Sequence, residues 1–172
     1  MRPLSFLLAF LIGGICSAQE QAISNRGALK LRLFVDDENF YEDDVKAGPY
    51  FVKEGVIQVY PGERLYVDAK VGEGGVLTDM HVVTTPKDTA KVIILEFVQH
   101  ANGRQHEMMM LTVNNPYDDD LHYSAIAYFL KHGQWGETTT IPVGARISAF
   151  ESWPDVIVTM ALSDWKVGPS KR

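Results

Sequence analysis

Polar and apolar positions alternate over many short stretches of this chain, which is the pattern of half-buried β-strands. Residues 28–35 read ALKLRLFV, with the apolar side chains on one side and Lys30 and Arg32 on the other. Residues 64–71, RLYVDAKV, alternate in the same way. Turn-forming Pro, Gly, Asn and Asp separate such stretches, and no segment of helical length carries a 3.6-residue apolar period.

The spacing of these stretches predicts an all-β fold. The expected strands are residues 28–35, 56–60, 64–71, 76–84, 91–99, 106–114, 121–131, 137–141, 146–150 and 156–167. Short strands joined by turns at this spacing are typical of an immunoglobulin-like antiparallel β-sandwich, and a small β-barrel is the alternative.

One hairpin is predicted in detail from an Asn-Gly pair. Asn102 and Gly103 stand between two apolar stretches, and this dipeptide favours a two-residue turn. The resulting register places Phe97 opposite Met108, Leu95 opposite Met110, and Gln99 opposite His106. Met108 and Met110 are then expected in the core.

The first eighteen residues, MRPLSFLLAFLIGGICSA, have the pattern of a secretory signal peptide. Arg2 precedes an apolar run, and small residues end at Ala18, where a signal peptidase would cut. A membrane anchor and a lipoprotein acylated on Cys16 are the alternatives. The sequence thus predicts a single β-sandwich domain over residues 19–172, located in the periplasm or secreted.

Charge and cysteine content narrow the chemistry. The 172 residues carry a formal net charge of −6, which disfavours a nucleic-acid partner. The one cysteine, Cys16, lies in the predicted leader, so the processed chain would have no disulfide and no thiolate metal site. Beyond the leader no stretch reaches the roughly 18 apolar residues of a membrane helix, and no membrane span is expected in the mature chain.

A His/Met strand face is the candidate metal site. His106, Met108 and Met110 share one face of the expected strand, and Met80-His81 is a second pair. Thioether and imidazole ligands suit copper. Three residues about 6.6 Å apart along one strand need a ligand from another element to share one ion, so core packing of the methionines is the preferred interpretation.

Acidic segments with aromatic neighbours are the candidate partner-binding loops. They surround Asp37, Tyr41 and Asp43 in residues 36–44, and Tyr117 and Asp119 in residues 115–120. Neither segment has the spacing of a calcium loop, so solvated loops are preferred over a calcium site.

The function predicted from these patterns is non-enzymatic. No nucleophile elbow, nucleotide-binding glycine motif or zinc-protease motif occurs, and no catalytic residue or cofactor is assigned. We expect an exported binding module whose partner is an envelope protein or a cell-surface polymer. A periplasmic copper-binding protein is the alternative, and an enzyme with a spatially assembled carboxylate/His site is the third candidate.

Overall fold

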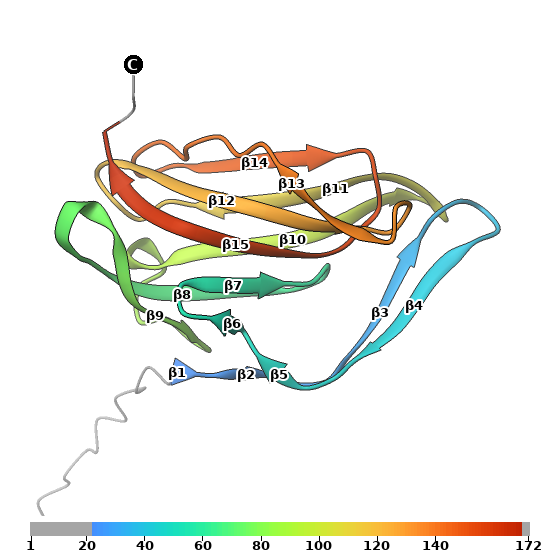
Figure 1. Ribbon diagram of the computed structural model, residues 1–172, viewed down its shortest axis with the longest axis horizontal. Helices are drawn as coiled ribbons and strands as arrows, with labels where there is room; N and C mark the ends of the chain where they lie inside the picture. The colour runs from blue at the N-terminus through green and yellow to red at the C-terminus, as the bar shows by residue number, and fades with distance from the viewer. Residues whose placement is uncertain (1–21, 170–172) are drawn as a thin grey trace, which may run out of the picture.

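Two antiparallel sheets face each other around the main hydrophobic core (Figure 1). The computed structural model describes residues 22–169, so the predicted leader, residues 1–18, lies outside the described residues. The strands are β1 Ala22–Ile23, β2 Asn25–Arg26, β3 Leu29–Phe34, β4 Phe40–Val45, β5 Gly48–Pro49, β6 Phe51–Lys53, β7 Val56–Val59, β8 Arg64–Val71, β9 Leu77–Val83, β10 Ile93–Asn102, β11 Gln105–Asn114, β12 Asp120–Phe129, β13 Gln134–Thr138, β14 Ser148–Trp153 and β15 Ile157–Gly168. Two short 3-10 turns, η1 Glu73–Gly75 and η2 Thr89–Lys91, flank β9.

The larger sheet has the order β1-β9-β8-β10-β11-β14, and the smaller has the order β13-β12-β15-β7-β6. Phe97 and Met109 from the first sheet and Ile57, Met160 and Leu162 from the second are fully buried in one core cluster. The expected all-β class is confirmed for the described residues, and the two packed sheets are consistent with a β-sandwich. Neither sheet closes on itself, so the alternative prediction of a small β-barrel is wrong for this part of the chain.

The hairpin β3–β4 is a separate two-stranded sheet packed against the outside of the smaller sheet. Leu31 and Leu33 of β3 are buried against Val156, just before β15, and Val158, the second residue of β15. This explains why residues 156–162 are buried without a break: β15 is covered on both faces. The alternation read in residues 28–35 is therefore correct, but its apolar side faces outside the main core.

The acidic segment 36–44 is not the loop that the sequence predicts. Only residues 35–39 form the turn, in which a carboxylate oxygen of Asp36 accepts hydrogen bonds from the backbone N–H of Glu38 (2.9 Å) and Asn39 (2.8 Å). The hydrogen bond from the Asn39 side chain, together with these two backbone bonds, lowers the pKa of Asp36. The rest of the segment is strand β4, because pairing with β3 lets Tyr41 and Val45 pack with Leu31 and Leu33.

The predicted register of the β10–β11 hairpin is also wrong. Phe97 pairs with Leu111, Leu95 with Val113 and Gln99 with Met109. The turn residues are Gly103, with φ +63°, and Arg104, because Asn102 pairs with Gln105. A bulge beside His100 and Ala101 changes the register once more. The net three-residue shift reverses which methionines face the core, since strand side chains alternate.

Within residues 22–169 we find no helix with the length and hydropathy that crossing a membrane would require.

Candidate binding cleft

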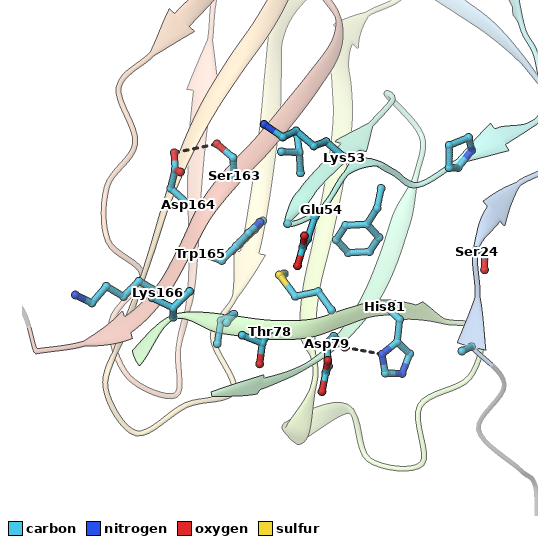
Figure 2. A pocket seen from close by; sticks show the side chains of 18 of the residues that line it. Ser24, Lys53, Glu54, Thr78, Asp79, His81, Ser163, Asp164, Trp165 and Lys166 are labelled. Atoms are coloured by element: carbon cyan, nitrogen blue, oxygen red, sulfur yellow. Dashed lines mark hydrogen bonds between the residues drawn. The ribbon is translucent and has the colours of Figure 1, made fainter. Parts of the chain in front are cut away.

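A cleft of about 970 Å³ opens at the side of the molecule where the two sheets end (Figure 2). Its walls are β9, the last β strand of the larger sheet before the short β1, and the β6–β7 hairpin of the smaller sheet. The C-terminal part of β15 forms the base, and residues 22–24 border the opening.

Two β-bulges shape this cleft. In β9, Asp79 and Met80 together oppose the single residue Ala69 of β8. In β15, Asp164 and Trp165 together oppose Tyr123 of β12. Each bulge begins with an aspartate in the left-handed region, with φ +52° at Asp79 and φ +55° at Asp164. Aspartate tolerates this region better than most residues, and bulges of this kind re-aim the side chain that follows.

The re-aimed side chains are Met80 and Trp165. Both pack on the main core, and both line the cleft. Without the bulges, strict alternation along β15 from Leu162 would place Asp164, and not Trp165, on the inner side. The two bulges thus replace two carboxylates on the cleft floor by a thioether and an indole.

Trp165 has one polar atom without a partner. The side chain is 3% exposed and stacks on Tyr123, with ring centroids 5.1 Å apart. Its indole Nε1 is buried and has no hydrogen-bond partner in the described part of the chain. Figure 2 shows the nitrogen edge of this ring on the side of the cleft where Lys53 and Glu54 lie. A buried N–H without an acceptor is costly, by about 1–3 kcal/mol, and is rare in folded proteins.

Charged side chains of both signs surround the mouth. Lys53, Glu54, Asp164 and Lys166 are exposed lining residues. The fifth exposed charge, Asp79, forms an ion pair with a lysine of β8, at 3.0 Å between Nζ and Oδ2. The cleft therefore offers an apolar floor, one buried donor and a rim of mixed charge.

His81 lies on the β9 wall. Its Nδ1 is 2.9 Å from the backbone oxygen of Asp79, and a carbonyl only accepts, so Nδ1 carries the proton in this bond. Nε2 is 3.7 Å from a carboxylate oxygen of Asp68. The hydroxyl of Ser163 donates to Asp164 at 3.0 Å. Among the described residues, no hydrogen bond joins a serine of the cleft to this histidine, which is the pairing that an activated serine nucleophile needs.

One end of the cleft is closed by a contact that only glycine allows. Gly75 in η1 has φ +82°, and a Cβ there would come within 1.9 Å of the backbone oxygen of Val167. The neighbouring Val76 bridges to Lys166 of β15. Gly75 thus lets the connection before β9 reach β15, which joins the two sheets at this end.

The candidate partner-binding residues do not lie on one surface. Asp37 is in the β3–β4 turn, and Tyr41 and Asp43 lie on β4, where the Tyr41 hydroxyl donates to Asp43 at 3.2 Å. Tyr117 and Asp119 follow β11 at its opposite end, about 30 Å from the β10–β11 turn that contacts the β3–β4 tip.

Tyr117 is also less available than the sequence implies. It packs against the main core, and burial, with a smaller contribution from the Asp68 carboxylate, raises the pKa of its hydroxyl to about 12. The buried Asn115 holds this loop, since its side-chain amide donates to the backbone oxygens of Asp119 (2.8 Å) and Val143 (2.8 Å).

The candidate metal ligands are also divided. The Nδ1 of His106 is 3.0 Å from the side-chain nitrogen of Gln99, and its Nε2 is 3.1 Å from the backbone oxygen of Pro154. Gln99 pairs with the buried Met109, so both belong to the inward side of the sheet. Met108 and Met110 flank Met109 and point outward, so the predicted core packing of these two methionines is wrong.

The patterns in the sequence did not predict the cleft. Of its lining residues only Met80 and His81 were singled out, as a soft ligand pair. A lone aspartate within an otherwise regular strand is the one local signal of each bulge. Comparisons with protein-family models, curated proteins and solved structures found no match to this chain.

Proposed function

We propose that this protein is a non-enzymatic binding module that holds an extended segment of a partner polypeptide in the cleft between β9 and the β6–β7 hairpin. The observation that carries the proposal is the buried indole N–H of Trp165, which has no acceptor among the described residues. Because this atom is covered in the free protein, the side chains over it would move aside on binding, and a backbone carbonyl of the bound segment would then supply the acceptor and remove the cost of the unpaired donor.

Two open sheet edges favour an extended polypeptide over a compact ligand. Within residues 22–169, β1 pairs with β9 only at Val82 and Val83, so residues 77–81 have a described strand partner on the β8 side alone. In the same part of the chain, β6 pairs only with β7. Open edges present backbone donors and acceptors that a partner strand can use, and alternate side chains of that strand would enter the cleft.

The rim charges favour a partner segment that carries charges of both signs. Lys53 and Lys166 would attract carboxylates, and Glu54 and Asp164 would attract basic side chains. Because these groups are solvent-exposed, they contribute more to association rate and register than to affinity. An envelope protein fits this description, and a neutral surface polymer fits it less well.

We also propose that the protein is periplasmic or secreted and that its sandwich is immunoglobulin-like. The predicted signal peptide supports a periplasmic or secreted protein, and the position of the only cysteine within that leader agrees with it. The two facing antiparallel sheets support an immunoglobulin-like arrangement.

A phage-displayed library of random twelve-residue peptides, panned on the purified protein, tests the proposal. Selected peptides should bind Trp165→Phe about 2- to 10-fold more weakly, as expected for one lost hydrogen bond of 0.5–1.5 kcal/mol. The matched control is Trp153→Phe on β14, which should bind with unchanged affinity.

A second measurement leaves the protein unaltered. N-methylation of a selected peptide, one position at a time, should abolish binding at alternate positions, because every second N–H of an added strand faces the sheet edge. Failure to enrich any peptide would contradict the proposal. So would peptides that bind Trp165→Phe as tightly as the wild type and tolerate N-methylation everywhere.

A further inference from the structure

A His/Met cluster lies on the outer face of the larger sheet, away from the cleft. Strands β10 and β11 are neighbours in this sheet (Figure 1). His100 of β10 pairs directly with Met108 of β11, and Val98 pairs with Met110. Met109, between the two methionines, is 0% exposed, whereas Met108 is 38% exposed. Because side chains alternate, His100, Met108 and Met110 share the outward face.

The pairing of β10 with β11 adds a metal ligand from a second strand, which the methionines of β11 need to share one ion. Met108 and Met110 are about 6.6 Å apart along β11, too far to share an ion without a ligand between them. Directly opposed residues of neighbouring strands have Cβ atoms about 4.5–5.5 Å apart, and diagonal neighbours about 7–8 Å. His100 therefore stands beside Met108 and diagonally from Met110, within reach of both long, flexible thioethers.

The three side chains are free to bind. His100 is exposed, and no hydrogen bond or ion pair of its ring is found within residues 22–169. By contrast, both ring nitrogens of His106 are occupied, by Gln99 and by the backbone of Pro154. The β-bulge next to His100 is what separates the two histidines onto opposite sides of the sheet.

We propose that His100, Met108 and Met110 form a three-coordinate site for monovalent copper, with one imidazole nitrogen and two thioether sulfurs as ligands. Neutral soft ligands without a carboxylate suit Cu(I) better than Zn(II) or Ca(II). The site lies on the outer sheet face and does not depend on ligand binding in the cleft.

The test is a titration of the full chain with Cu(I) under ascorbate, in competition with a chromogenic Cu(I) chelator. The lone thiol of Cys16 would compete for copper, so Cys16→Ser is the background for every variant. One equivalent of Cu(I) should bind. His100→Asn and Met108→Leu should each weaken binding at least as much as the roughly 10- to 100-fold loss known for outer-shell substitutions.

The matched controls are His106→Asn and Met80→Leu, which remove the same residue types at other places and should leave Cu(I) affinity unchanged. Redox-inert Ag(I) adds a direct readout in a chain with ¹³C-labelled methionine methyl groups. The methyl signals of Met108 and Met110 should shift, and that of Met109 should not.

Three results would overturn the site. They are the absence of Cu(I) binding in the Cys16→Ser background, equal affinity of the His100→Asn variant, and loss of binding in the His106→Asn variant. None of these outcomes bears on peptide binding, so the copper site and the proposed function fail or stand separately.

Discussion

Arg26 of β2 holds the N-terminal strands against the sandwich, and its removal gives a sharp test of the structure. The side chain is 5% exposed and pairs with Glu63, at 2.9 Å between Nε and Oε1. The guanidinium also donates to the backbone oxygens of Pro49 (3.2 Å) and Gln58. It lies over the aromatic rings of Tyr50 and Tyr60. The backbone N–H of Tyr60 donates to the same carboxylate, at 2.8 Å.

The expected loss follows from the carboxylate that Arg26 leaves behind. Glu63 is 11% exposed, so Arg26→Met strands a buried charge, and breaking such a pair costs about 3–5 kcal/mol. This is a large part of the roughly 5–15 kcal/mol of a typical domain. With an m-value of about 2 kcal/mol/M, a loss of 4 kcal/mol lowers the urea midpoint by about 2 M.

Urea unfolding of four variants separates the charge effect from lost packing. Glu63→Gln removes the stranded charge, so Arg26→Met/Glu63→Gln should be more stable than the sum of the single losses by at least about 1 kcal/mol. The matched control is Arg64→Met, which breaks an exposed pair with Glu96 and should cost no more than about 1 kcal/mol. An Arg26→Met loss as small as this control, or strict additivity, would refute the reasoning.

Three further predictions concern the core, the sheet junction and a half-buried tyrosine. Met109→Ala should cost about 2–5 kcal/mol in chemical unfolding and Met108→Ala well under 1, and the reverse order would contradict the hairpin register. Gly75→Ala should destabilise by more than about 1 kcal/mol in thermal unfolding, while Gly168→Ala, with open space around it, should be close to neutral. Because the folded pKa of Tyr117, about 12, lies above its unfolded value near 10, stability should fall as pH rises from 10 to 12, and Tyr117→Phe should reduce that fall in denaturation curves recorded across this range.

The strands were predictable because their alternation is local. Residues 64–71 were predicted as a strand and form β8 with the same bounds, because its polar and apolar positions alternate regularly. The β10–β11 register was not predictable from the turn, since three consecutive methionines give no alternation to choose between facings. The burial of Met109 and Leu111 determines which side of β11 faces the core. The turn is therefore at Gly103 and Arg104, one residue beyond the predicted position.

The cleft was not predictable because its parts are distant in the sequence. The walls come from residues 51–56 and 76–81, the base comes from residues 163–166, and only the fold brings them together. Each bulge extends a strand by one residue at Asp79 or Asp164 and leaves the local composition unchanged. The outer hairpin β3–β4 was only partly predictable for the same reason. Alternation in residues 28–35 predicts which side of the strand is apolar, but it does not predict that this side packs on β15 outside the main core.

The indole N–H signal of Trp165 tests the central claim most directly. A ¹⁵N-labelled chain should give three tryptophan indole signals, and Trp165→Phe identifies the relevant one. On addition of a peptide selected from the library, this proton should move downfield as it donates to a carbonyl, and the amide signals of residues 77–81 should shift with it. A bound peptide that leaves the Trp165 indole signal and these amides unmoved would contradict the cleft as the binding site.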